Sequence, residues 1–261
     1  MVKKETAPKA GDIAKAIEEF APLETQAAWD NSGFTVGSPC AIVHKALVAL
    51  NCTKEVVEEA VAKGCDMLIT HHPLIVHSPC MNILEGDVRG DAIAAAIRGG
   101  LTVYSSHTPL DKARGGLNDI MAAKLGLSGC EILGADGFGV VGTLKEKMSS
   151  SEFIGFVKKS FNAKNIRCSK PLKCKVLKVA VSSGGGQGSI KDALAKGAQV
   201  LVTGDVTHHN YYVPDGFMVM DIGHHQSEWS AVDLLVRLVK KNFPTFALLQ
   251  SAKDISPIYY Y

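Results

Sequence analysis

Histidines stand next to one another at three places in this chain. Nine histidines occur among 261 residues, and six of them form the adjacent pairs His71–His72, His208–His209 and His224–His225. Neighbouring side chains of an extended segment point to opposite sides, so a pair at the end of a strand can address two different metal ions. The pairs therefore favour a site for divalent metal ions over isolated core histidines.

Two carboxylates follow histidines at the same spacing. His107 precedes Asp111 by four residues, and His224 precedes Glu228 by four residues. Two ions that lie about 3.5 to 4 Å apart usually need a bridging carboxylate, and neutral imidazole nitrogens complete such sites. If a helix begins at His224, that residue and Glu228 share one of its faces, whereas Pro109 favours a turn before Asp111. The two carboxylates need not have identical roles.

The elements that must position these side chains occur twice. In each half an apolar strand, a helix closed by glycine and a second apolar strand follow one another, which is the order of a βαβ unit. The histidines at 71 and 72 come directly after the second strand of the first unit. The expected elements are 45–50, 53–63 and 67–70 in the first half, and 178–182, 189–196 and 199–203 in the second half.

A gapless match between the halves indicates an internal duplication. Residues 62–70 align with residues 195–203, because 195 minus 62 and 203 minus 70 are both 133. The alternative is that any two βαβ units look alike after a helix that ends in Lys-Gly. Open α/β sheets place ligands at the carboxyl ends of their strands, so each half would supply a histidine and a carboxylate. A further helix and strand are expected in each half, at 88–98 with 101–105 and at 206–212 with 217–221.

The pattern as a whole predicts an α/β protein built from two duplicated halves, with the metal site in the cleft between them. We expect residues 1–130 to form the first half, and residues 131–261 to form linker strands and the second half. The sequence pattern of the linker predicts short strands over 130–144 and a serine-capped helix over 149–161. An apolar helix over 229–239 and a last strand over 246–250 would complete the second half.

Composition and charge exclude several classes of protein. The formal net charge is +2, from 28 basic and 26 acidic residues, and no run of five like charges suggests a nucleic-acid partner. The opening residues MVKKETAPKAGD contain two lysines but no apolar stretch behind them of the kind expected in a signal peptide, and no later apolar run reaches the roughly 18 residues of a spanning helix. We therefore expect a globular cytoplasmic protein that has no membrane partner.

The cysteines give little support to other chemistry. Seven are scattered along the chain without a C-x-x-C pair, which predicts reduced thiols rather than a disulfide scaffold or a zinc ribbon. No G-x-S-x-G elbow occurs, and Cys80 has only His77 nearby as a suggestive partner. Metal chemistry is the better prediction.

Three further segments each allow two interpretations. The glycine-rich residues 183–189 could cradle a phosphate at a helix N-terminus, but they lack dinucleotide and Walker patterns, so a tight turn is favoured. Residues 29–33 (WDNSG) suit either the lip of a pocket or an Asx turn. His208 and His209 are expected in a helix and suit either pocket lining or direct metal ligation.

Four parts of the chain together resemble the Nif-three-like family, many of whose members carry the name GTP cyclohydrolase 1 type 2 homologue. The resemblance spans nearly the whole chain. The histidine pair, the His-Thr-x-x-Asp turn and the Gly-His-x-x-x-Glu segment are specific in combination. The matching parts are 28–33 (AWDNSG), 66–74 (DMLITHHPL), 104–119 (YSSHTPLDKARGGLND), and 203–209 with 221–228 (TGDVTHH and DIGHHQSE).

The resemblance implies a duplicated α/β fold with a dinuclear metal site and a ring-like homohexamer. It also implies that the extra central domain of longer members is missing here, and that His107 lies close to the site. Nitrogen and oxygen ligands accommodate zinc, iron and manganese alike, so the metal stays open. The ligands implied at matching positions are His71, His72, Asp111, His224 and Glu228.

Two functions follow from such a site. The first is a metal-dependent hydrolase that acts on a nucleotide-like or phosphate-containing small molecule with a metal-activated water. His107, His208 and His209 are its candidate proton-transfer residues. The alternative is a non-catalytic metal-binding regulatory or scaffold protein that acts through protein partners.

Overall fold

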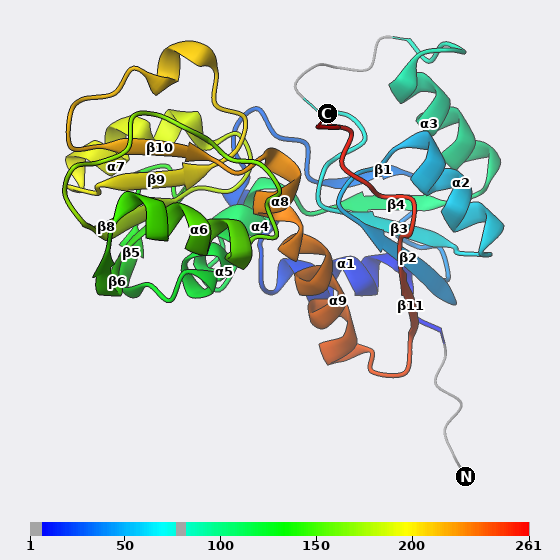
Figure 1. Ribbon diagram of the computed structural model, residues 1–261. Coiled ribbons are helices and arrows are strands. Elements are labelled where there is room, and N and C mark those ends of the chain that lie inside the picture. Colours follow the sequence, from blue (N-terminus) through cyan, green and yellow to red (C-terminus); the bar gives the residue numbers. More distant parts are fainter. Residues whose placement is uncertain (1–6, 77–81, 261) are drawn as a thin grey trace. The chain divides into compact units, whose positions relative to one another are not determined.

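The computed structural model describes residues 7–76 and 82–260 (Figure 1). The described chain divides into two compact units. Unit 1 contains the described part of Met1–Leu110 together with Ala231–Pro257, and unit 2 contains Asp111–Ser230 together with the described part of Ile258–Tyr261. This division differs from the one expected at residue 130, because unit 2 already begins at Asp111 and the chain after Ser230 returns to unit 1.

Unit 1 is organised by a sheet of five strands, counted among the described residues, in the order β1-β4-β3-β2-β11. Strands β4, β3, β2 and β11 run parallel, and β1 is antiparallel to β4. The strands are β1 (Gly33–Val36), β2 (Lys45–Ala49), β3 (Met67–Thr70), β4 (Thr102–Ser105) and β11 (Ala247–Gln250).

The central strands of unit 1 are covered on both faces, which explains their almost continuous apolar sequence. Leu47, Leu68 and Val103 pack into a buried cluster with residues of α2 and α3. Figure 1 shows α2 and α3 on one face of the sheet and α1 and α9 on the other. These helices are α1 (Ala10–Glu18), α2 (Lys54–Ala62), α3 (Val88–Arg98) and α9 (Ser230–Asn242).

The helices of the first βαβ region begin at the residues that the sequence predicts. The Thr53 hydroxyl accepts from the Val56 amide at 3.4 Å, and the Asp87 carboxylate accepts from the Gly90 amide at 2.6 Å. Such side-chain caps satisfy backbone donors that have no partner inside the helix. The predicted helices at 53–63 and 88–98 are confirmed.

The last strand belongs to unit 1 rather than to the second half. Strand β11 pairs in parallel with β2, from Ala247 opposite Lys45 to Gln250 opposite Val48. The strand itself was predicted at 246–250. Its pairing could not be predicted, because local pattern does not identify a neighbour about 200 residues away.

Unit 2 is organised by a second sheet, whose six described strands have the order β5-β6-β8-β9-β10-β7. Strands β8, β9 and β10 are parallel, and the others join antiparallel. The strands are β5 (Ser128–Ile132), β6 (Val140–Met148), β7 (Arg167–Cys168), β8 (Val176–Val181), β9 (Val200–Thr203) and β10 (Met218–Asp221).

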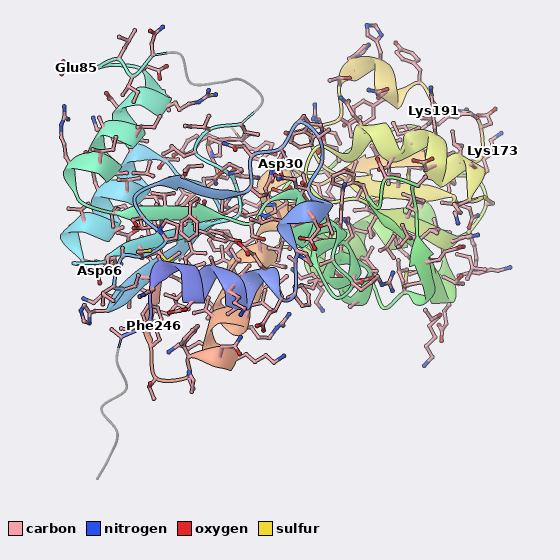
Figure 2. The ribbon with its side chains drawn as sticks, turned by 180° about the vertical axis from the view of Figure 1, so that it is seen from behind. Asp30, Asp66, Glu85, Lys173, Lys191 and Phe246 are labelled. Atoms are coloured by element: carbon pink, nitrogen blue, oxygen red, sulfur yellow. The ribbon has the colours of Figure 1, made fainter. Side chains whose placement is uncertain are left out.

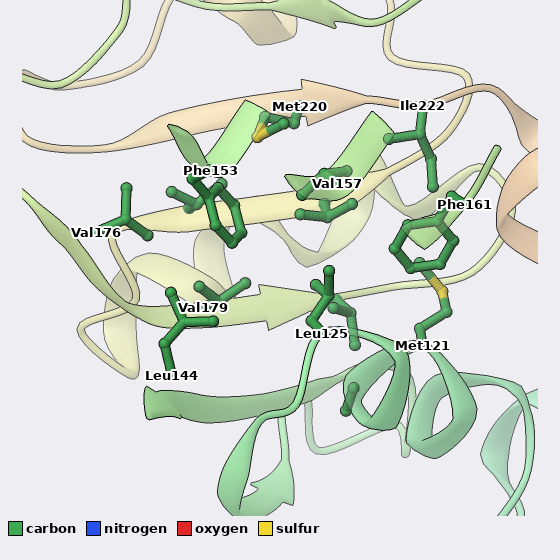
Figure 3. Packing of buried hydrophobic residues seen from close by; sticks show 14 of the residues in the cluster. Met121, Leu125, Leu144, Phe153, Val157, Phe161, Val176, Val179, Met220 and Ile222 are labelled. Atoms are coloured by element: carbon green, nitrogen blue, oxygen red, sulfur yellow. The ribbon is translucent and has the colours of Figure 1, made fainter. Parts of the chain in front are cut away.

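Figure 3 shows the larger core of unit 2, where helices α5 (Leu117–Lys124) and α6 (Ser150–Ser160) pack on one face of the sheet. Phe153 and Val157 of α6 meet Val179 of β8 in this core. Helix α7 (Ile190–Ala195) contributes Ala193 to a separate cluster with alternate strand residues. The predicted linker strands and the serine-capped helix are therefore present, and they form part of unit 2.

The helix predicted at residues 206–212 does not form. Residues 206–212 contain only the 3-10 turn η3 (His208–Tyr211). The Thr207 hydroxyl and the Asn210 amide both donate to Gln187 Oε1, at 3.0 and 2.7 Å. Such side-chain bonds compete with helix formation.

The internal duplication is confirmed by strand order and by individual hydrogen bonds. The order β1-β4-β3-β2 in unit 1 corresponds to β7-β10-β9-β8 in unit 2. Asp66, labelled in Figure 2 at the amino end of β3, accepts from two successive backbone amides next to β2. Gln199, which lies 133 positions later, does the same with two amides of β8. The amides belong to His44 and Lys45, and to Leu177 and Lys178.

Within the described ranges, no helix has both the length and the apolar character that crossing a bilayer requires.

Candidate metal centre

Three imidazoles meet at the carboxyl end of the unit 1 sheet, and we call them the imidazole cluster. His71 and His72 follow β3 directly, and His107 follows β4. Strands β3 and β4 end in register, with Thr70 opposite Ser105, which brings the residues after them together. The ring centroids lie 4.9 Å apart for His71 and His72, and 5.2 and 5.4 Å from His107. One nitrogen from each ring lies within 4.8 Å of the others, so the cluster could hold a metal ion.

Oxygen acceptors hold the first two rings through Nδ1. His71 Nδ1 lies 2.9 Å from the Ser106 carbonyl oxygen, and His72 Nδ1 lies 2.8 Å from Asn51 Oδ1. The Asn51 amide in turn donates to Asp254 Oδ1 at 2.9 Å. An acceptor at Nδ1 places the ring proton there and leaves the lone pair on Nε2, which is the form that binds a metal. Asp254 thus fixes His72 through Asn51.

A buried carboxylate holds the third ring. Asp30, labelled in Figure 2, has a side chain that is 0% exposed, and its Oδ1 accepts from His107 Nδ1 at 2.8 Å. Its Oδ2 accepts from the Thr108 amide at 3.1 Å and from the Thr108 hydroxyl. Burial raises the pKa of Asp30, but the hydrogen bonds from His107 and Thr108 outweigh it and hold this pKa well below its usual range. The WDNSG segment therefore positions His107.

In unit 2 a short helix carries the second predicted histidine and carboxylate. Helix α8 (His224–Glu228) begins directly after Gly223, as predicted. His224 Nε2 lies 2.9 Å from Glu228 Oε2, and its Nδ1 lies 2.7 Å from Asp205 Oδ2. Burial lowers the pKa of His224, but hydrogen bonds and charge from Asp205 and Glu228 raise it to about 10. These carboxylates therefore attract positive charge strongly, whether it is a proton or a metal ion.

A second carboxylate lies close to Glu228. Asp111 offers an oxygen within 4.8 Å of one from Glu228, and the two residues are only 5% and 3% exposed. Two buried carboxylates at this separation repel each other unless a cation or a proton compensates them. Asp111, His224 and Glu228 form the carboxylate cluster.

The chain around Asp111 differs from the expected turn. Residues Thr108–Lys112 form the single-turn helix α4, in whose first turn Pro109 is tolerated because it need not donate a hydrogen bond. Ser183 Oγ donates to Asp111 Oδ1 at 2.6 Å. The Asn118 side chain donates to the Asp111 carbonyl oxygen at 3.0 Å and accepts from the Ser183 amide at 2.8 Å.

The glycine-rich loop serves as a tight turn that positions carboxylates. The Gly184 amide donates to Ser227 Oγ at 2.9 Å, and the Gly186 amide donates to Thr203 Oγ1 at 2.9 Å. Gly184 has a φ of +60°, and a Cβ on it would clash with Glu228 Oε1. Because these amides are used inside the unit, the structure favours the turn over the phosphate cradle.

The remaining predicted residues lie elsewhere. His208 and His209 are exposed on η3, where both rings pack with Tyr212. They belong to no donor group among the residues that the structure describes. His77 and Cys80 lie outside the described residues, and the described cysteines have free thiols.

Several residues that hold the donor side chains were not predicted from the sequence. Asp205 lies 133 positions after His72, so the duplication itself could have drawn attention to it, and Asn51 could have been noticed as a polar residue shortly after β2. Asp254 had no such signal. The structure adds Asp30, Asn51, Ser183, Asp205 and Asp254 as residues that contact the predicted ligands or their supports.

The two sheets and their donor clusters define an α/β protein with His, Asp and Glu groups that could hold a metal ion. The chain belongs to the DUF34/NIF3 (NGG1p interacting factor 3) family, whose sequence model matches residues 8–256. A Clostridium perfringens protein named GTP cyclohydrolase 1 type 2 homolog is 34% identical over 257 residues, which cover 94% of this chain and 98% of that protein. A Methanocaldococcus jannaschii protein of the same name is 34% identical over 225 residues, covering 84% and 90%.

Solved structures confirm the fold. A Bacillus cereus protein related to NIF3 has a TM-score of 0.90 at 23% identity, covering 98% of this chain and 100% of that one. Reduced HcgD from Methanocaldococcus jannaschii has a TM-score of 0.81 at 32% identity, covering 93% and 97%. The family resemblance and the α/β fold class are both confirmed.

Proposed function

We propose that this chain binds two divalent metal ions and hydrolyses a nucleotide-like or phosphate-containing small molecule. The proposed ligands are His71 and His72 from the imidazole cluster, together with Asp111, His224 and Glu228 from the carboxylate cluster. When bound, the ions would polarise the substrate and lower the pKa of a water molecule. Zinc, iron and manganese all suit these donors.

The observation that carries the proposal is the pair of buried carboxylates in unit 2. One carboxylate oxygen of Asp111 lies within 4.8 Å of one from Glu228, and both residues are almost fully buried. A cation between such groups would offset their repulsion, and His224 adds a nitrogen donor 2.9 Å from Glu228. The donor chemistry of the cluster therefore fits a divalent ion.

The contacts of His107 support a role in proton transfer. Asp30 Oδ1 lies 2.8 Å from His107 Nδ1 and so orients the ring. The other ring nitrogen, Nε2, is then the atom that would transfer a proton. The ring also lies 5.6 Å from the Trp29 ring, centroid to centroid. Among the three predicted proton-transfer histidines, His107 is the one whose neighbours are donor histidines.

The substrate class comes from the relatives. They carry the name GTP cyclohydrolase 1 type 2 homolog, which contains the name of a nucleotide, GTP. Hydrolysis of a nucleotide-like or phosphate-containing molecule is the corresponding proposal for this chain.

The proposal is tested by metal-dependent turnover. Protein loaded with zinc, iron or manganese is assayed against nucleotides and phosphoesters, in wild type, His72→Ala and the control His44→Ala. His44 is an exposed histidine of unit 1 outside the imidazole cluster. We expect turnover that His72→Ala abolishes and His44→Ala preserves. Turnover that survives both complete chelation and His72→Ala would contradict the proposal.

The same experiment addresses the non-catalytic alternative. Bound metal without turnover on any substrate, combined with a loss of thermal stability on chelation, would favour a metal-binding scaffold. The homohexamer is a further proposal, which light scattering coupled to size-exclusion chromatography tests directly.

A further inference from the structure

A cavity of about 700 Å³ lies beside His72 within unit 1. Its volume is in the range of pockets that bind small organic molecules. Three segments line it: residues 51–53 before α2, residues 72–74 after β3, and the turn before α3 together with the first two residues of that helix. Figure 2 marks this last turn with Glu85. The lining includes His72, Leu74, Leu84, Asp87, Val88 and Arg89.

One charged group in this lining has no ion-pair partner among the residues that the structure describes. Asp87 caps α3 through the Gly90 amide, and the nearby Lys54 pairs with Asp91 at 3.2 Å. Arg89, in the first turn of α3, makes no ion pair or hydrogen bond with any residue that the structure describes. A guanidinium presents paired N–H donors that match a phosphate or a carboxylate.

The same cavity has an apolar side. Val88 is 81% exposed and Leu84 is 62% exposed, although both are large apolar residues. Leu74, by contrast, is only 6% exposed. Apolar side chains that line a cavity and remain open to water gain free energy when the body of an organic molecule covers them.

We propose that this cavity binds a small organic oxyanion. Arg89 binds its phosphate or carboxylate, Val88 and Leu84 cover its apolar body, and the far end of the molecule reaches towards His72. The inference rests on the proposed function, because it takes His72 as a metal ligand and places the substrate beside it. It deepens that function by assigning a pocket and an anion-binding residue.

Three matched probes test the chemistry. Phenyl phosphate, benzoate and benzyl alcohol share one ring and differ in the anionic group. Isothermal titration of zinc-loaded protein should show saturable binding of phenyl phosphate, benzoate or both, and which of them binds identifies the oxyanion. Benzyl alcohol should bind at least tenfold more weakly. Equal affinity for benzyl alcohol, or no binding of either anion, would overturn the inference.

Two arginines of the same helix provide the matched variants. Arg89→Gln should weaken anion binding at least tenfold, and Arg89→Lys, which keeps the charge but loses the fork of donors, should weaken it less. Arg98→Gln at the opposite end of α3 should change affinity by less than twofold. An anion affinity that Arg89→Gln leaves unchanged would show that the anion binds elsewhere.

A separate readout distinguishes this inference from the proposed function. Zinc stoichiometry is measured on each variant, and Arg89→Gln should retain the wild-type value because Arg89 is not a proposed ligand. Zinc binding without anion binding would overturn the pocket and leave the metal site standing. Arg89-dependent anion binding by a protein that takes up no zinc would support the pocket and contradict the proposed function.

Discussion

The two donor clusters come from duplicated units but differ in chemistry. The imidazole cluster offers three ring nitrogens, and two of its rings are held by uncharged oxygen acceptors. The carboxylate cluster offers Asp111 and Glu228, with His224 between carboxylates. After β3 the chain continues with His71 and His72, whereas after β9 the residues 133 positions later are Gly204 and Asp205. Duplication thus preserved the position of the donors at the strand ends while their chemistry diverged.

The two units also differ in the number of residues between the end of a strand and the donor histidine, after β4 in unit 1 and after β10 in unit 2. Thr102 of β4 pairs with Met67, and Met218 of β10 pairs with Val200. Counting from these pairs, His107 corresponds to Gly223 rather than to His224. One additional residue therefore separates β10 from the donor histidine, and this explains why the two His-x-x-x-acid segments are not equivalent.

The largest expected effect is the loss of one buried carboxylate. Glu228→Gln should weaken manganese binding by about 100-fold, because a neutral amide replaces a charged oxygen donor. Zinc binding should fall less, since the imidazole cluster keeps its nitrogen donors. The measurement is competition with a chelator, with Glu131→Gln as an exposed control. Equal losses of manganese and zinc affinity would contradict the distinction between an oxygen-rich and a nitrogen-rich cluster.

A second variant tests whether the glycine-rich loop shapes the carboxylate cluster. Gly184→Ala should lower metal affinity by about 30-fold and unfolding free energy by about 1 to 2 kcal/mol, because its Cβ would clash with Glu228 and its φ is positive. Gly188→Ala is the matched control, since nothing lies within 4 Å of a Cβ there. If both variants bind metal like wild type, the loop does not position Glu228.

A third variant tests the support of the imidazole cluster. Asp254→Asn should weaken zinc binding by about 10-fold, since residues that orient a ligand histidine typically contribute that much. Its effect acts through Asn51, so the wild-type stoichiometry should remain. Zinc titration calorimetry gives both values, and Asp215→Asn, whose side chain is 98% exposed, serves as the control. An unchanged zinc affinity would show that Asp254 does not support the ligand His72.

The smallest expected effect concerns pH. The pKa of His224 is raised to about 10 in the metal-free protein, so its protonated form stabilises the fold. This contribution is fully present below about pH 6.5, the pKa of an unperturbed histidine, and is lost as pH rises through about 10. Because the ring is partly exposed, we expect a change on the order of 1 kcal/mol in unfolding free energy. Urea unfolding of the apo protein between pH 7 and 10 measures it, and His224→Gln should flatten the dependence.

The comparison also shows which features the sequence could reveal. His71 and His72 follow a strand, and His224 and Glu228 share a helix face, so local rules placed all four. The segment 206–212 failed as a helix because its polar side chains bond Gln187, which local periodicity does not show. Asp254 and β11 depend on contacts with residues about 200 positions away, and for that reason no motif indicated them.

Anomalous diffraction at the zinc, iron and manganese edges, from crystals of protein purified without chelators, tests the central claim most directly. We expect two anomalous peaks per chain, with His71, His72, Asp111, His224 and Glu228 as the ligands. Crystals of protein supplied with each metal that show no anomalous peak at these residues would contradict it.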